Sequence, residues 1–308
     1  MKIVSIILVG FLFAGCAFAG CTLTEDEKKG GGRQECDITV VTREEGSGTR
    51  RAFVELTGIQ KGKQDKTTEN AEVTNSNFVV MMSVAGDKNA IGYVSLGTLG
   101  NLDQIGNSDK KESTNTAKEV KQIKAVKIDG VEASIEQIKE GKYRLVRNFY
   151  VVVGDNLSKT GQDFIDYVLS DEGQEIIEQY GYIGERTENT YKAAGLKGKV
   201  TMAGSTSAAP VLEHLAEKYR EYNPNVIFEI QQTGSTAGIE AATQGICDIG
   251  ITSRELNDSE RVRGLTEIRI AIDGIAVIVN RENKWNDMTM EDIRKIYTGD
   301  ITNWEGNL

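Results

Sequence analysis

The sequence has few of the residues that usually supply catalytic or metal-binding groups. Its 308 residues include one histidine, four cysteines and only two prolines. These counts exclude a histidine-rich metal protein and a proline-rich low-complexity chain, and no cluster of His, Cys and Asp at metal-ligand spacing is present. We therefore expect neither a metal nor a cofactor.

Acidic residues outnumber basic ones, 46 to 36, which gives a formal net charge of -10 at pH 7. This balance argues against nucleic acid as a partner, because its phosphates select for basic surfaces. A small anion stays possible, since its binding depends on the local field. Hydrophobic side chains make up 39% of the chain, enough for one large domain or two ordinary ones.

The N-terminus has the pattern of an export signal. One lysine precedes a short apolar run, "IVSIILVGFLF", which is then followed by small residues. "FAGC" occurs twice, ending at Cys16 and at Cys21, and each copy resembles a lipoprotein cleavage box. We predict a signal over residues 1–21, acylation of Cys16 or Cys21, and a flexible tether over 22–35.

Two cysteines lie in the part that we expect to fold, Cys36 and Cys247. Export permits a disulfide between them, but nothing in the sequence indicates that they meet. Two buried small apolar residues are an equally good interpretation.

Beyond residue 33 the chain alternates strand-like and helix-like segments, which predicts an α/β fold. The predicted strands cover 36–42, 89–97, 120–128, 148–154, 199–205, 225–232, 247–253 and 274–280. The predicted helices cover 48–56, 161–170, 175–180, 207–221, 238–244 and 289–297, with a break at 171–174 and a loop over 103–116.

Three strand-to-helix junctions share one chemistry: "GSGT" at 46–49, "GSTS" at 204–207 and "GSTAG" at 234–238. Glycine lets the backbone approach a ligand, Ser or Thr caps the helix, and the first N–H groups point outward. Each junction can therefore hold an anion at the positive end of a helix dipole. Ordinary helix capping explains one such motif, but three in one chain favour an oxyanion site.

Arg43 stands four residues before the serine of "GSGT". We interpret it as the formal positive charge on the anion, with Glu45 holding its guanidinium. The alternative is a surface ion pair with Glu44 or Glu45, which would contribute little.

Enzyme motifs are missing. No Gly-Lys-Ser/Thr follows the glycine turns, no GxSxG is present, and the single histidine, His214, fits a helix surface better than a base beside a serine. We predict binding without catalysis.

Five segments together resemble the phosphate-binding protein of the phosphate-specific ABC importer: "ITVVTREEGSGTRRAFVEL", "VTMAGSTSAAPVLEHLAEKY", "QQTGSTAGIEAATQGICDIGITSREL", "IAIDGIAVIVN" and "MTMEDIRKIYTGDITNW". The resemblance implies a type II periplasmic-binding-protein fold, in which two α/β lobes joined by a two-strand hinge close on phosphate. It assigns the following phosphate-binding residues: Arg43, Ser47, Gly48, Thr49, Thr206, Ser207, Ser235 and Ser253.

The order of these segments differs from the family pattern, in which "GSTS" follows the signal and "REEGSGTR" comes later. We interpret this as a circular permutation, with residues 190–200 joining the old termini and with Leu308 close to residues 30–33. One lobe would comprise 36–145 and 280–308 and the other 146–279, with the hinge near 147–153 and 276–280.

The resemblance also implies the setting of the protein: an extracytoplasmic monomer, on the membrane by a lipid anchor only, that passes phosphate to an importer permease. Some family members have an aspartate where this chain has Ser253, so selection against sulfate would depend on Glu45 or a backbone carbonyl. The alternatives are a binding protein for sulfate, molybdate or tungstate, a phosphate-sensing domain, and a phosphotransfer enzyme.

Overall fold

A computed structural model describes residues 37–62, 64–100, 121–185 and 189–305 of the chain. They belong to one compact unit, Cys36–Leu308. The predicted signal at 1–21, the tether at 22–35, the loop at 103–116, Cys36 and the expected proximity of Leu308 to residues 30–33 all lie outside the described residues.

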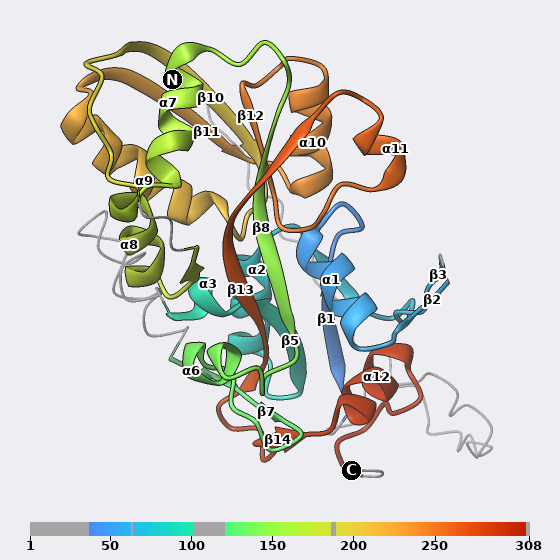
Figure 1. Cartoon of the computed structure of the whole chain (residues 1–308). Coiled ribbons are helices and arrows are strands. Elements are labelled where there is room, and N and C mark those ends of the chain that lie inside the picture. The colour runs from blue at the N-terminus through green and yellow to red at the C-terminus, as the bar shows by residue number, and fades with distance from the viewer. Residues whose placement is uncertain (1–36, 63, 101–120, 186–188, 306–308) are drawn as a thin grey trace, which may run out of the picture. The chain divides into compact units, whose positions relative to one another are not determined.

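The unit is a mixed α/β structure built on a ten-stranded sheet (Figure 1). Its main path runs in the order β11 (Asn225–Gln232), β10 (Lys197–Gly204), β12 (Ile249–Thr252), β8 (Val146–Val153), β13 (Thr266–Asn280), β5 (Ala90–Ser95), β1 (Thr39–Arg43) and β4 (Glu72–Thr74). Two further strands pair with β13, namely β6 (Ile123–Ala125) and β9 (Ile183–Gly184). Two small sheets pair β14 (Asp287–Met288) with β7 (Lys127–Ile128), and β2 (Gln60–Lys61) with β3 (Gln64–Asp65).

β13 connects the two ends of this sheet. It is 15 residues long, pairs antiparallel with β8 over Thr266 to Gly274, and pairs antiparallel with β5 over Ile275 to Val279. β8 and β13 run side by side through the middle of the unit (Figure 1). The outer strands on each side pair in parallel, as expected where helices connect them.

Six of the described helices begin behind a serine or threonine that caps them. Ser47, Ser76, Ser134, Ser158, Ser170 and Thr289 each accept a hydrogen bond from a first-turn N–H group. The helices are α1 (Gly48–Leu56), α2 (Asn77–Gly86), α3 (Leu96–Gly100), α6 (Ile135–Lys139), α7 (Lys159–Val168), α8 (Asp171–Gln179), α9 (Ala209–Tyr222), α10 (Ser235–Thr243), α11 (Asp258–Arg261) and α12 (Met290–Thr298). No helix among the described residues is long and apolar enough to cross a membrane.

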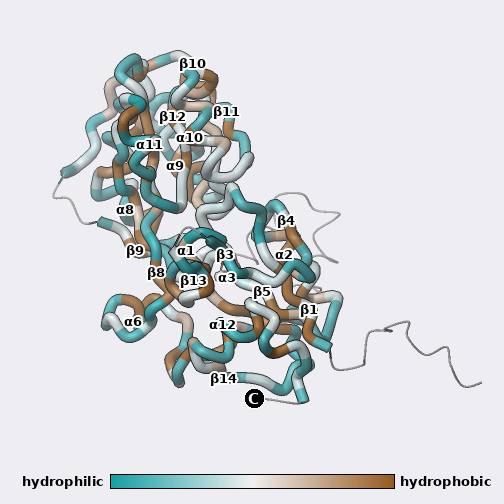
Figure 2. The backbone as a smooth tube through the Cα atoms, turned by 90° about the vertical axis from the view of Figure 1, so that its right-hand side faces the viewer, coloured by the Kyte–Doolittle hydropathy of each residue, from teal (hydrophilic) through white to brown (hydrophobic). Residues whose placement is uncertain are grey.

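Buried apolar residues form four clusters. The buried members of two clusters all come from 149–271, and those of the other two come from 40–145 and 275–304. α2 is one of the hydrophobic stretches of the chain (Figure 2), and its Val80, Met81 and Val84 are fully buried. The core is thus divided in space, and β13 contributes to both parts.

Several sequence predictions need correction. The break expected at 171–174 lies instead at Leu169 and Ser170, where Ser170 caps α8. α10 begins at Ser235, three residues before the predicted start, and β13 begins at Thr266, eight residues before its predicted start. α2 was not predicted, because its apolar run "NFVVMMSVAG" lacks the helical periodicity of a half-exposed helix.

Candidate anion-binding site

The first junction places a helix start directly after a buried strand. β1 ends at Arg43, the chain turns through residues 44–47, and α1 begins at Gly48. The Ser47 hydroxyl caps the helix by accepting from the N–H of Arg50 at 3.3 Å. The N–H groups of Gly48 and Thr49 belong to the first turn, which has no intrahelical acceptor for them.

The other two junctions follow β10 and β11. Gly204 ends β10 with a positive φ of 145°, and a Cβ there would lie 2.0 Å from the carbonyl oxygen of Ile251. The Gly204 carbonyl accepts from the N–H groups of Thr233 and Gly234, which ties the two junctions together. Our expectation of a Ser or Thr cap is wrong for α10, because Gly234 with a φ of 91° is its N-cap and has no side chain to cap with.

The cap of α9 also differs from the expectation. The helix begins at Ala209 behind Ala208, and no side chain caps it from that position. The Ser205 hydroxyl instead accepts from the N–H groups of Ser207 and Ala208, at 3.3 and 3.4 Å. This leaves the Thr206 and Ser207 hydroxyls available for other partners.

The structure brings the junction hydroxyls together. Thr49 Oγ1 lies 3.0 Å from Ser207 Oγ, and Ser235 Oγ lies 3.2 Å from Ser253 Oγ. Gly48 packs against the second pair, because a Cβ at this position would lie 2.4 Å from Ser253 Oγ. All of these residues are buried. The three junctions and Ser253, which follows β12, therefore meet at one hydroxyl-lined point.

Arg43 is 1% exposed and its guanidinium reaches this point. Its Nη2 donates to Thr206 Oγ1 at 3.2 Å, and its Nη1 donates to Asn77 Oδ1 at 3.4 Å. Nε and Nη2 bind the two carboxylate oxygens of Glu44 at 3.0 and 2.9 Å. The prediction that Glu45 holds the guanidinium is therefore wrong, since Glu45 is exposed and Glu44 makes the bidentate pair.

Two site residues were missed by the sequence analysis. Arg147, in β8, donates from Nη1 to Thr49 Oγ1 at 2.6 Å, and Asn77, the first residue of α2, donates from Nδ2 to Ser207 Oγ at 2.8 Å. Asp273, directly opposite Arg147 on β13, binds its guanidinium through Oδ2. One signal was present: Arg147 and Asp273 directly precede the predicted apolar strands 148–154 and 274–280, and charged side chains need a partner when buried.

The groups gathered at this point are of the kinds that bind anions. They are hydroxyls, helix N-termini and guanidinium groups, all of which donate hydrogen bonds to an oxyanion.

The single histidine lies outside this group. His214 is 38% exposed on α9, where it contacts Glu217 and the ring of Tyr180. Among the described residues no group of three His, Cys, Asp or Glu side chains could hold a metal ion. Cys247 is buried, forms no disulfide with any described residue, and has its Sγ 3.4 Å from the carbonyl oxygen of Ile249.

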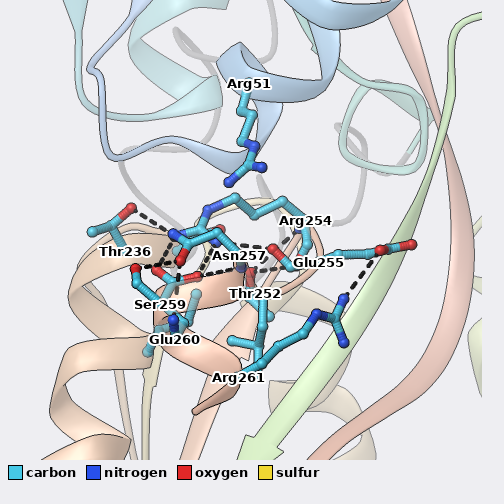
Figure 3. Close-up of polar contacts among 12 residues, drawn as sticks. Arg51, Thr236, Thr252, Arg254, Glu255, Asn257, Ser259, Glu260 and Arg261 are labelled. Carbon is cyan, nitrogen blue, oxygen red and sulfur yellow. Dashed lines mark hydrogen bonds and ion pairs between the residues drawn. The ribbon is translucent and has the colours of Figure 1, made fainter. Parts of the chain in front are cut away.

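A second polar cluster borders the site between α1 and the loop after β12 (Figure 3). Arg254 donates from Nη1 and Nη2 to the two carboxylate oxygens of Glu260, both at 2.7 Å, and from Nη2 to Thr236 Oγ1 at 3.1 Å. Arg51 of α1 points toward this pair in Figure 3. The N–H of Thr236 donates to the carbonyl of Gly46 at 3.1 Å, so the cluster also fixes α10 against the α1 junction.

Glu260→Gln is expected to lower the free energy of unfolding by about 1–3 kcal/mol, because it leaves the buried Arg254 guanidinium poorly compensated. Burial raises the pKa of Glu260, but hydrogen bonds from Arg254 and the Asn257 N–H outweigh it, so the pKa lies below its usual range. A depressed folded-state pKa stabilises the protein above the unfolded pKa, and this stabilisation is lost as the pH falls through the folded pKa.

Urea unfolding at a series of acidic pH values would measure this effect. Stability should fall less steeply with acid in Glu260→Gln than in the unsubstituted protein. The matched control is Glu229→Gln, whose carboxylate pairs with Lys199 on the surface and is 55% exposed. Equal stability losses in the two variants would show that the Arg254–Glu260 pair contributes nothing particular.

The fold and the site define a ligand-binding protein of the periplasmic-binding-protein class. The family profile described as "PBP superfamily domain" matches residues 23–172 and 189–307. The chain is 43% identical over 273 residues to "Phosphate-binding protein PstS 2" of Streptococcus agalactiae. This match covers 87% of this chain and 86% of that protein.

A crystal structure is similar as well. That of a phosphate ABC transporter, phosphate-binding protein from Streptococcus pneumoniae matches with a TM-score of 0.64 and 41% identity, covering 87% of this chain and 98% of that one. "Phosphate-binding protein PstS" of Bacillus subtilis is 30% identical over 131 residues, which is 41% of this chain and 44% of that protein. The chain belongs to the PstS family of phosphate-binding proteins, which confirms the family that the motifs indicated.

Proposed function

We propose that the protein binds inorganic phosphate at the point where the three junctions meet and delivers it to the permease of an ABC importer. The observation that carries the proposal is the convergence of Arg43, the α1 and α10 N-termini and four junction hydroxyls. The phosphate-binding names of the relatives support it. We propose as phosphate ligands the residues predicted from the sequence: Arg43, Ser47, Gly48, Thr49, Thr206, Ser207, Ser235 and Ser253.

Binding would follow closure of two lobes, 36–145 with 280–308 and 146–279, around a hinge formed by β8 and β13. The division of the hydrophobic clusters supports two lobes, with the boundary in β13 between Ala271 and Ile275 and not at 279, because residues 275–279 pack in the clusters of the first lobe. The contacts Arg43–Thr206, Thr49–Ser207 and Thr236–Gly46 all join one proposed lobe to the other. A phosphate that accepts hydrogen bonds from both sides would favour the closed form by its differential affinity for that form.

The proposal includes no catalytic step. The hydroxyls of the site lie among other hydroxyls and guanidinium groups, which donate hydrogen bonds but do not remove a proton. Serine hydroxyls both donate and accept hydrogen bonds, so Ser235 or Ser253 can accept a hydrogen bond from the P–OH group that phosphate keeps at neutral pH and sulfate lacks. Glu44, which binds Arg43 as was predicted for Glu45, is the other hydrogen-bond acceptor beside Arg43.

Isothermal titration of the purified protein tests the function directly. We expect one phosphate to bind with a Kd in the micromolar range or tighter, about -8 kcal/mol or better. Sulfate should bind at least about 100-fold more weakly, because it has no proton for the site's acceptor. Molybdate and tungstate serve as further comparisons. A folded protein that prefers sulfate or molybdate to phosphate would assign it to another oxyanion.

We also propose that the chain is a circular permutation of the more common family order. Its support is the pairing of the ends of the described part, where Asp37 bridges Asn303 and the Ile38 N–H donates to the Thr302 carbonyl at 2.8 Å. The 273-residue match indicates that the S. agalactiae relative has the same order of segments. A chain cut within residues 190–195 and rejoined between 305 and 37 should bind phosphate with an unchanged Kd; failure to fold would contradict the proposal.

The N-terminal signals support an extracytoplasmic location and a lipid anchor on Cys16 or Cys21, with the folded part acting as a monomer. Mass spectrometry of the N-terminal peptide from membranes would identify the acylated cysteine. An unmodified mature N-terminus would exclude the anchor.

A further inference from the structure

Arg147 is a second buried cation at the proposed site. Its side chain is 3% exposed, and the guanidinium donates from Nη1 to Thr49 Oγ1 at 2.6 Å. Thr49 Oγ1 in turn lies 3.0 Å from Ser207 Oγ. Arg147 therefore reaches the same group of hydroxyls as Arg43, but from the opposite proposed lobe.

Asp273 orients this guanidinium by binding Nε and Nη2, and it does not bind Nη1. The aspartate Oδ2 accepts from Nε at 3.1 Å and from Nη2 at 2.9 Å. Its other oxygen, Oδ1, accepts from Ser95 Oγ at 3.0 Å and from the Gly97 N–H at 3.3 Å. The two oxygens of Asp273 thus accept four hydrogen bonds, two of them from Nε and Nη2 of Arg147. Nη1 of Arg147 is left to donate to Thr49.

The two arginines repel each other across the hydroxyls. Burial lowers the pKa of Arg147 against the opposing effect of Asp273, and the positive charge of Arg43 lowers it further. An arginine nevertheless keeps its proton in a protein, so the repulsion is not relieved by deprotonation. Negative charge placed between the two guanidinium groups would relieve it, and a doubly charged anion would do so more than a singly charged one.

We propose that Arg147 is a second anion-binding residue, held in place by Asp273, and that it makes the site prefer the dianionic form of phosphate. This inference rests on phosphate being the ligand. Nη1 of Arg147, which donates to Thr49 in the structure, would donate to a phosphate oxygen when the anion binds. Arg43 would contact the anion from the other side. β8 and β13 would then contribute a ligand-binding group as well as the hinge.

The test is a phosphate titration at several pH values across the second ionisation of inorganic phosphate, near neutral pH. Three variants are compared: Arg147→Gln, Arg147→Lys and the double variant Arg147→Met with Asp273→Leu. The double variant removes both buried charges together, which proteins tolerate far better than the loss of one partner. Thermal unfolding without phosphate reports the stability of each variant separately.

For the unsubstituted protein we expect affinity to rise as phosphate becomes dianionic. Arg147→Gln and the double variant should bind phosphate about 10- to 100-fold more weakly, as for the loss of a charge-assisted hydrogen bond. Their affinity should also rise less with pH, whereas Arg147→Lys should keep most of the rise. A purely structural Arg147 would change the unfolding temperature and leave the pH profile of Kd unaltered.

Two outcomes separate this inference from the proposed function. A double variant that is folded and has the Kd and pH profile of the unsubstituted protein would overturn the inference and leave phosphate binding intact. An unsubstituted protein that is folded and binds no phosphate would overturn the proposed function and the inference with it.

Discussion

Replacing Arg43 by alanine is expected to weaken phosphate binding by about 2–5 kcal/mol, roughly 30- to 4000-fold in Kd. The guanidinium is buried, is held by Glu44 in a bidentate pair, and contacts Thr206 across the proposed lobe boundary. Loss of the guanidinium would remove the positive charge beside the bound anion and would leave the negative Glu44 carboxylate unpaired near that anion. Titration calorimetry on Arg43→Ala measures the effect.

Arg51→Ala is the matched control for this prediction. Arg51 lies on α1 with its side chain 38% exposed and pairs with Glu55 on the helix surface. Such pairs contribute about 0–1 kcal/mol, so Kd should change by at most about fivefold. Arg50 is a poorer control, because its Nη1 donates to the Arg43 carbonyl at 2.8 Å and so supports the site. Equal losses in Arg43→Ala and Arg51→Ala would mean that the charge has been assigned to the wrong arginine.

Gly48→Ala is expected to reduce phosphate affinity by roughly 100-fold, at the upper end of the 1–3 kcal/mol typical of overpacking. A Cβ on Gly48 would lie 2.4 Å from Ser253 Oγ, 2.8 Å from Ser235 Oγ and 2.9 Å from the Ser253 carbonyl carbon. The last of these atoms is backbone and cannot swing away. The methyl group would therefore hold α1 away from the two serines and oppose closure on the ligand.

The unliganded protein should tolerate this substitution, because alanine is a better helix former than glycine and Gly48 has no positive φ. The control is Gly46→Ala, two residues earlier in the same motif, where a Cβ would meet only the Thr236 side chain, at ordinary distances of 3.5 Å from Cβ and 3.8 Å from Oγ1. We expect that variant to keep Kd within about twofold. Titration of both variants, with urea unfolding of each, separates affinity from stability; a normal Kd for Gly48→Ala would show that the two serines do not close on α1.

Local signals predicted the elements that carry the motifs. α1 has the predicted bounds, Gly48–Leu56, because Ser47 caps it and the following residues favour a helix. β11 also has its predicted bounds, since its eight residues form one uninterrupted strand-like run. In each case the deciding interactions lie within a few residues of the chain.

Glu44 and Glu45 show where local reasoning failed. Strand alternation would place residue 45 on the same side as residue 43, which favours Glu45 as the partner of the arginine. β1, however, ends at Arg43, and residues 44–47 form a turn in which the Ser47 N–H donates to the Glu44 carbonyl. The alternation of side chains stops with the strand, so Glu44 meets the guanidinium.

The sequence by itself determined the family, the α/β class and the positions of the three strand-to-helix junctions, because these depend on motifs and on backbone preferences of neighbouring residues. Only the tertiary structure decided that Arg147 and Asn77 belong to the site, and that Asp273 orients Arg147. Arg147 and Thr49 are 98 residues apart, and Asn77 and Ser207 are 130 apart. Such contacts arise from how the strands pair across β8 and β13, which no short stretch of sequence encodes.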